Sequence, residues 1–255
     1  MIRKSKRYLS AMIIGVMVIS NMLGAISVSA ETSDIKVTAI EKVNTDYEIY
    51  PSPQSVEYEE GSFNFGSDVN VVYEKGIDNY TKSRLEDEIL KAHSISYEVS
   101  DSNQIINGKT NILVGVYGSG EAVDRYAEKY TLLTENLFSK TDSYFLVSDN
   151  NVITVLGKDT DSAFYGLTTL YHIFNQVTDN EIRNFKIEDY ANVVTRGFIE
   201  GYYGNPWSVQ DRADLMTYGG YYKLNAYFYA PKDDPKHRVQ WRSLYTEDEL
   251  KWIKQ

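Results

Sequence analysis

The sequence predicts an α/β protein built from two successive parts. Strand and helix patterns alternate between residues 47 and 190, and a second series of strand, helix, strand and helix begins near Asn192. The chain has 255 residues, of which 42% are hydrophobic and none is cysteine, so it is long enough to form a core without disulfides. We therefore expect an N-terminal α/β domain over residues 47–190 and a second unit over residues 191–255.

The first 30 residues have the pattern of an export signal. A basic start is followed by a mostly apolar segment over residues 11–23 and by the small residues Val28-Ser29-Ala30. The alternative is an uncleaved membrane anchor, since residues 11–28 are nearly long enough to span a bilayer. The polar Asn21 and the small-residue exit favour cleavage after Ala30. We thus expect a secreted, extracellular or cell-surface protein that is not stably inserted in a membrane after cleavage, with a polar linker over residues 31–46.

The N-terminal domain is expected to alternate short strands with two amphipathic helices. Apolar residues at helical spacing predict a helix over residues 81–92 and a second one over residues 160–174. Short apolar runs predict strands, and Asp149-Asn150-Asn151 predicts a hairpin turn. The expected strands cover residues 69–73, 110–116, 144–147 and 152–156.

Composition excludes several kinds of site. The net charge of −10 disfavours nucleic-acid binding, because an acidic surface repels phosphate. The three histidines have no metal-ligand spacing, so we expect no zinc or iron site, and nothing indicates a cofactor. His172 is of a residue type that can act as a base, but it lies in the predicted helix over residues 160–174 without a nearby carboxylate, which favours a structural role.

The second unit reads as the opening of a parallel α/β fold. Strand patterns cover residues 193–200 and 224–229, and Ser208 with Asp211 has the helix-start signature, with a helix to about Tyr222. Thr246 begins a second such signature. A (β/α)₈ TIM barrel needs about 250 residues, so we expect only the first two βα units of an incomplete barrel.

Two loops follow these strands, over residues 200–207 and 230–238. The carboxyl ends of barrel strands carry the substrate contacts, and both loops are rich in glycine, aromatic, lysine and carboxylate side chains. They predict a site for a polar ligand. Because glycine, proline and aspartate also form ordinary turns, a purely structural role for both loops stays open.

Two long motifs make the prediction more specific. Residues 196–207, RGFIEGYYGNPW, and residues 223–238, KLNAYFYAPKDDPKHR, resemble the first and second barrel strands and loops of family-84 glycoside hydrolases. The helix that contains Phe164 and Leu170 is similar to the last helix of the α/β domain that precedes the barrel in that family. The resemblance covers about residues 45–255. The family includes O-GlcNAcases and bacterial enzymes called hyaluronidases.

The resemblance implies particular site residues. The sugar-contacting glycine of the family falls on Gly201 and its contacting lysine on Lys232, while Tyr202 and Asp233 are expected in the wall of the site. Catalysis in the family uses two adjacent aspartates after a later strand. Asp233 and Asp234 do not match that pair, which is expected beyond Gln255, so no catalytic residue is expected in this chain.

The resemblance implies the N-terminal part of a secreted β-N-acetylglucosaminidase, with glycans that contain N-acetylglucosamine as partners. The family mechanism is retaining and substrate-assisted: the 2-acetamido oxygen attacks the anomeric carbon, forming an oxazoline. We expect the chain by itself to be inactive. The alternative is a non-catalytic carbohydrate-binding or adhesion protein that keeps only the front domain.

Overall fold

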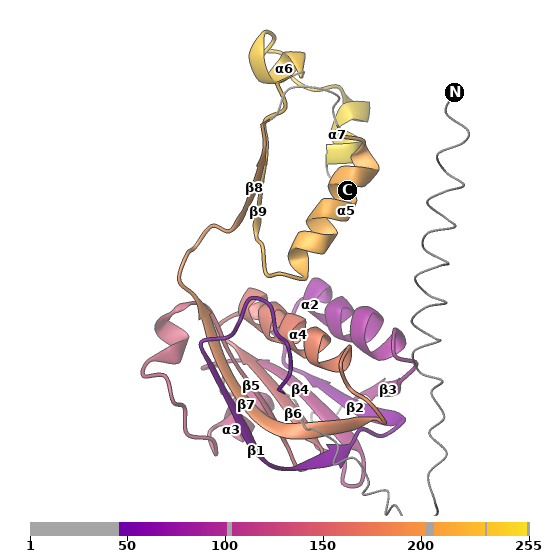
Figure 1. Ribbon diagram of the computed structural model, residues 1–255, viewed down its shortest axis with the longest axis vertical. Helices are drawn as coiled ribbons and strands as arrows, with labels where there is room; N and C mark the ends of the chain where they lie inside the picture. The colour runs from indigo at the N-terminus through magenta and orange to yellow at the C-terminus, as the bar shows by residue number, and fades with distance from the viewer. Residues whose placement is uncertain (1–45, 101–103, 202–206, 233, 254–255) are drawn as a thin grey trace, which may run out of the picture. The chain divides into compact units, whose positions relative to one another are not determined.

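A computed structural model describes residues 46–100, 104–201, 207–232 and 234–253 (Figure 1). The predicted signal and linker therefore lie outside the described residues, apart from Asp46. The described residues all belong to one compact unit. Among them, no helix is both long and apolar enough to cross a bilayer.

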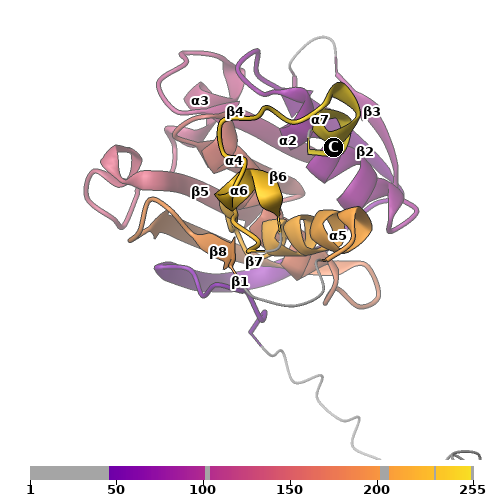
Figure 2. The same cartoon turned by 90° about the horizontal axis from the view of Figure 1, so that it is seen from above.

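The described residues up to Ala191 include a mixed sheet of seven strands, with β1 at one edge and β3 at the other (Figure 2). The order of the hydrogen-bonded strands across the sheet is β1-β7-β5-β6-β4-β2-β3. The neighbours β6, β4, β2 and β3 are parallel, whereas β1, β7, β5 and β6 are antiparallel. In chain order the strands are β1 (Ser55–Asn64), β2 (Asp68–Tyr73), β3 (Ser96–Val99), β4 (Thr110–Val116), β5 (Thr141–Asp149), β6 (Val152–Gly157) and β7 (Glu181–Ala191).

Both faces of this sheet are covered. α4 (Thr160–Phe174) and α2 (Asn79–Leu85), which continues as the π-helix η1 (Glu86–Lys91), lie side by side on one face (Figure 1). α3 (Ala122–Ala127) and the 3₁₀ turn η2 (Leu137–Ser139) cover the other face. Successive strand side chains point to opposite faces, so neighbouring residues of β4 contribute to separate cores: Ile112 packs with α2 and α4, and Leu113 with α3 and η2.

The predicted helices and strands of this domain are confirmed. The turn between β5 and β6 has two residues in the left-handed region, Asn150 with φ 48° and Asn151 with φ 65°. This is the geometry of a two-residue hairpin whose twist matches the strands. The sequence patterns missed β1, β3, β7 and α3, because β1 and β7 mix charged and apolar residues and the other two elements are only four and six residues long.

The part of the chain after Ala191 contains two parallel strands, β8 (Gly197–Glu200) and β9 (Ala226–Tyr229), joined by α5 (Val209–Gly220). α6 (Pro235–Arg238) and α7 (Glu247–Ile253) follow. The predicted Ser208 cap of α5 is confirmed: Asp211 N donates to Ser208 Oγ and Ser208 N donates to the Asp211 carboxylate.

The strand predicted over residues 193–200 was predicted too long. The structure shows that β8 covers only Gly197–Glu200. The carbonyl groups of Val193 and Val194 do not join the ladder. The Arg196 guanidinium donates to the Val193 carbonyl at 2.8 Å, and the Asn225 side-chain amide donates to the Val194 carbonyl at 2.8 Å. Side chains thus occupy the groups that strand pairing would have used, and β8 begins at Gly197.

Candidate functional site

The carboxyl ends of β8 and β9 lie next to each other. Glu200 pairs with Tyr229 in the parallel register, and the Ala230 N–H donates to the Glu200 carbonyl at 3.0 Å. Gly201 directly follows β8, and Lys232 follows β9 by three residues. The two predicted binding loops therefore start side by side at one edge of the strand pair. Tyr202 and Asp233, predicted for the wall of the site, lie outside the described residues.

A buried ion pair fixes the end of β8. Arg212 of α5 donates from Nε and Nη2 to the two carboxylate oxygens of Glu200, each at 2.7 Å. The Tyr227 hydroxyl donates to the same carboxylate. Burial and the hydrogen bond to Glu200 raise the pKa of Tyr227 to about 12, so its hydroxyl stays a donor at neutral pH. This pair places the main chain of Gly201 relative to α5.

The two faces of the strand pair differ. Phe198 and Tyr227 point toward α5, with Phe198 lying near Gly219 and the Tyr227 ring 5.1 Å from the Phe198 ring. Ile199 and Phe228 point to the other face and are 67% and 51% exposed. Parallel strands in proteins are commonly buried on both faces, so this exposed apolar face is unusual for a parallel pair.

Two glycines of β8 and its loop have different requirements. A Cβ at Gly197 would lie 1.7 Å from the Ala226 carbonyl oxygen, so this position needs glycine for strand packing. At Gly201, the nearest described atom to such a Cβ would be Ile199 Cγ2 at 3.7 Å, an ordinary contact. Packing among the described residues thus explains the glycine at 197 and leaves the one at 201 without a structural reason.

Asp234 is a scaffold residue of the second loop. Its carboxylate accepts hydrogen bonds from the Tyr245 hydroxyl at 2.7 Å, the Lys236 N–H at 2.7 Å and the Tyr229 hydroxyl at 2.9 Å. Partial burial opposes ionisation, but these hydrogen bonds together lower the pKa of Asp234. A carboxyl group with a lowered pKa is a poor proton donor at neutral pH. This geometry indicates a scaffold role for Asp234 and disfavours a role as catalytic acid, as expected from its mismatch with the catalytic pair of the family.

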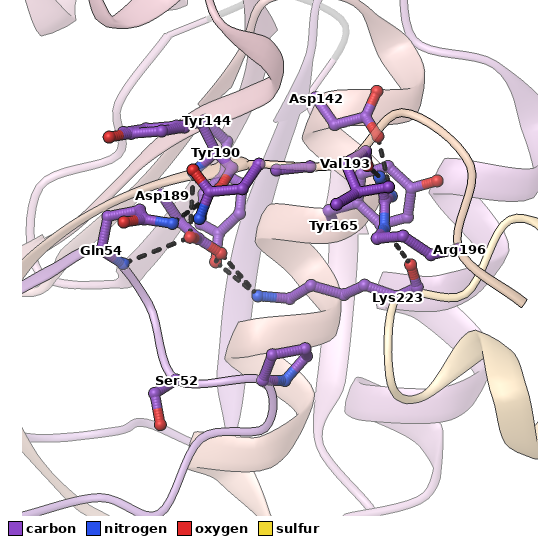
Figure 3. Close-up of a pocket in the computed structure, with 13 residues that line it drawn as sticks. Ser52, Gln54, Asp142, Tyr144, Tyr165, Asp189, Tyr190, Val193, Arg196 and Lys223 are labelled. Atoms are coloured by element: carbon purple, nitrogen blue, oxygen red, sulfur yellow. Dashed lines mark hydrogen bonds and ion pairs between the residues drawn. The ribbon is translucent and has the colours of Figure 1, made fainter.

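A separate pocket lies where the seven-stranded sheet meets the start of β8 and β9 (Figure 3). It has a volume of about 300 Å³. Arg196, just before β8, pairs with Asp142 at 2.7 Å and donates to the Lys223 carbonyl at 3.0 Å. Asp142 lies in a bulge of β5 with φ 51°, a conformation that costs an L-residue free energy and is retained only where the surroundings hold it.

The ammonium of Lys223 is a buried group of this pocket. It donates to Asp189 at 2.9 Å and to the Tyr144 hydroxyl at 2.8 Å, and Tyr144 also donates to Asp189. Burial lowers the pKa of Lys223, and the Asp189 carboxylate opposes that shift. Each of the charged groups of the pocket thus already has a partner within the protein, which makes this region a junction between the two parts of the chain.

His172 takes part in the same junction as a structural group, as expected. Its Nδ1 accepts the Tyr50 N–H at 3.1 Å, and its ring lies 6.1 Å from that of Tyr222. Burial lowers the pKa of His172, and the nearby Lys223 charge acts in the same direction. The histidine therefore holds the segment before β1 against α4.

Sequence reasoning missed Glu200, Arg212, Lys223 and Asp189. The pair of Glu200 and Arg212 could have been predicted from the sequence. Glu200 ends a strand and Arg212 lies in the first turn of the next helix, and such residues face each other in a βα unit. Lys223, in the turn before β9, and Asp189, in β7, lie 34 positions apart, and no local pattern connects them. No group of three or more histidine and carboxylate side chains within the described ranges could hold a metal ion.

Two family models match the chain. A model described as beta-N-acetylglucosaminidase matches residues 196–255, which include β8 and β9. A model described as glycosyl hydrolase family 20, domain 2, matches residues 46–190, more than half of the chain. The chain belongs to this second family. The family-20 domain is thus the seven-stranded sheet with its helices, and the βα units after it match the first family.

Solved structures extend the likeness across both parts. CpGH84D is 48% identical with a TM-score of 0.78, over 82% of this chain and 34% of that chain. CpGH84B is 29% identical with a TM-score of 0.68, again over 82% of this chain and 34% of that chain. The predicted resemblance to family-84 glycoside hydrolases is therefore confirmed.

A curated relative and a more distant structure complete the comparison. The protein O-GlcNAcase of Rattus norvegicus is 47% identical over 57 residues, which are 22% of this chain and 6% of that protein. A family-20 exo-β-N-acetylglucosaminidase of Vibrio harveyi, solved with N-acetylglucosamine, shares the fold at 18% identity and a TM-score of 0.51, over 71% of this chain and 25% of that chain. The chain thus spans at most about a third of the length of these relatives.

Proposed function

We propose that the chain supplies the first sugar-binding loops of a secreted β-N-acetylglucosaminidase that acts on glycoconjugates or glycosaminoglycans. One observation carries the proposal: the parallel register of β8 and β9 brings Gly201 and Lys232 to the same edge, where a (β/α)₈ barrel binds its substrate. The family matches of both parts of the chain support the sugar class.

In this proposal β8 and β9 are the first two strands of a barrel. Their exposed face, formed by Ile199 and Phe228, is then the barrel interior, and further strands cover it. Such an arrangement accounts for two parallel strands with one apolar face in water. It also accounts for the glycine at 201, since the absence of a side chain lets a sugar hydroxyl reach the main chain.

Lys232 and Gly201 bind and orient the sugar. The Lys232 ammonium has three N–H donors for hydroxyl oxygens. The reaction proposed is retaining: the oxygen of the 2-acetamido group forms a bond to C1 while the bond from C1 to the leaving group breaks, and a carboxylic acid gives its proton to the leaving group. Water then adds to C1, gives a proton to the same residue, and the acetamido group is regenerated.

The acid and its partner carboxylate are proposed to come from outside these 255 residues. The hydrogen bonds and lowered pKa of Asp234 support this assignment. We expect the chain alone to bind an N-acetylglucosaminide without hydrolysing it, and the complete gene product to hydrolyse it.

The experiment is turnover of an aryl β-N-acetylglucosaminide by both proteins, with the anomer of the released sugar followed by NMR. Hydrolysis by the complete product with β-sugar formed first is the expected result. Binding without turnover by the complete product would instead identify a non-catalytic carbohydrate-binding protein. Turnover by the 255-residue chain would contradict the placement of the acid outside it.

A further inference from the structure

A second hollow lies on the family-20 domain, beside the loop that leads into β5. It has a volume of about 550 Å³, which is within the range of small-ligand sites. The residues that line it are Tyr117, directly after β4, and members of residues 132–139, all of which the structure describes. The junction pocket of Figure 3 shares none of its lining residues.

An aromatic platform borders this hollow. The rings of Tyr117 and Phe138 stack with centroids 4.0 Å apart and planes 11° apart, and Tyr117 is 54% exposed. The stack holds the tyrosine ring at a fixed angle with one face toward solvent. Tyrosine rings have an apolar face and a polar tip, which suits the C–H face of a sugar ring and its hydroxyl groups.

The loop that carries Phe138 is held in place by buried residues of the domain. The Glu188 carboxylate is fully buried and accepts the N–H groups of Leu133 and Thr134, each at 2.6 Å. Leu137 is also fully buried in the core under α3. Because the loop is already ordered, a ligand would not have to supply the free energy of ordering it.

Hydrogen-bonding groups surround the platform. Within the described part of the chain, no hydrogen bond engages the side chains of Thr134, Glu135 and Asn136, so their hydroxyl, carboxylate and amide groups are open to a ligand. Glu135 is the one charged side chain among the lining residues, all of which are described. A carboxylate repels anions and accepts hydrogen bonds from hydroxyl groups, so the chemistry favours an uncharged polyol.

We propose that this hollow is a second glycan-binding site, which takes a neutral oligosaccharide with Tyr117 as its stacking platform. The identity of the sugar, N-acetylglucosamine, rests on the proposed function. The probe is therefore chitobiose, the β-1,4-linked disaccharide of N-acetylglucosamine. Such a site would hold the enzyme on a polymeric glycan at a distance from the barrel loops.

The test is chitobiose binding to the 255-residue chain, measured by ligand-observed NMR. Tyr117→Ala should weaken binding roughly tenfold or more, as truncation of a central aromatic contact commonly does. Tyr117→Phe keeps the ring and should bind nearly as wild type. Tyr80→Ala is the matched control, because Tyr80 is 83% exposed on α2 and does not line the hollow.

A fourth variant separates this site from the loops after β8 and β9. If Lys232→Ala abolishes binding and Tyr117→Ala does not, chitobiose binds only at the strand ends, and the second site is refuted while the proposed function stands. If Tyr117→Ala alone abolishes it, the second site is supported whatever the catalytic result. Equal binding by all variants, no binding by the wild type, or tighter binding of an anionic hyaluronan tetrasaccharide would each overturn the proposal.

Discussion

Lys223 Nζ lies 2.9 Å from Asp189 Oδ2, and this buried pair connects the turn before β9 to the last strand of the seven-stranded sheet. Both side chains are nearly inaccessible to solvent, and the Tyr144 hydroxyl contacts each of them. Removing one member of a buried pair leaves the other charge without compensation, which is far more costly than losing a surface ion pair.

We expect Lys223→Met to lower the free energy of unfolding by about 3–5 kcal/mol, because Asp189 then remains buried without its cation. Denaturant titration followed by circular dichroism measures the change. Lys75→Met is the control, since Lys75 is exposed on the loop after β2 and should change stability by less than about 0.5 kcal/mol. Similar small effects for both variants would mean that the junction is not held by this pair.

Glu200→Gln should also destabilise the chain, by about 3–5 kcal/mol, because the neutral amide no longer balances the charge of the buried Arg212 guanidinium. Replacing both residues by leucine should cost less than the losses in Glu200→Leu and Arg212→Leu added together, since neither charge then remains. A double-mutant cycle of unfolding free energies measures this coupling. Additive effects would show that the two side chains do not depend on each other.

Stability should fall on mild acidification because of His172. Burial lowers the pKa of His172, so the unfolded chain takes up a proton at a higher pH than the folded chain does. The free energy of unfolding therefore decreases as pH falls below about 6.5, the ordinary histidine value, and the decrease ends below the folded pKa.

His172→Asn keeps an acceptor for the Tyr50 N–H but cannot take up a proton in this range. The difference in Tm between about pH 7.5 and pH 5 should therefore shrink in this variant. His237→Asn, on the exposed helix α6, should leave that difference as in the wild type. An unchanged difference in His172→Asn would exclude this histidine as the source.

Local patterns were sufficient for much of the fold. The asparagine turn after β5, the helix of residues 160–174 and the Ser208 cap all depend on neighbours within a few positions, and all were predictable. The edge pairing of β1 with β7 joins Ser55 to Glu188, and such distant pairing has no local signal.

The same distinction applies to the candidate site. Gly201 and Lys232 could be placed at one edge, because parallel strands joined by a helix bring their carboxyl ends together. Lys223 was not predicted, because its role depends on a tyrosine and an aspartate from two other strands.

In the complete gene product, Lys232→Ala should lower kcat/KM roughly tenfold to a hundredfold, the effect of losing one charged hydrogen bond of about 1.5–3 kcal/mol to the sugar. The loss should be the same for substrates with good and with poor leaving groups, because binding is affected rather than proton transfer. Steady-state kinetics on a series of aryl glycosides measures this.

Asp233→Asn should have the smaller effect of the two. If Asp233 were the general acid, its loss would remove a factor of about 10²–10⁴, and good leaving groups would restore much of the rate. A large defect of that kind, with Lys232→Ala near wild type, would reverse both assignments.

The mature protein should begin at Glu31, because cleavage is expected after the small residues Val28-Ser29-Ala30. Mass spectrometry of protein recovered from the medium of an expressing culture measures the N-terminus. Ala30→Arg should block the cut, while Thr32→Arg, on the far side of it, should interfere less. Secreted material that still carries Met1 would contradict the prediction.

The position of Lys223 in the chain has a consequence for synthesis on the ribosome. Tyr144 and Asp189 leave the ribosome before Lys223 does, and domains fold in N-terminal order as the chain emerges. The seven strands can therefore be complete, with Tyr144 and Asp189 in place to accept the lysine, before β9 has left the ribosome. The family-20 domain would then act as a template for the next part of the chain, and β8 would spend less time as an unpaired edge open to other nascent chains.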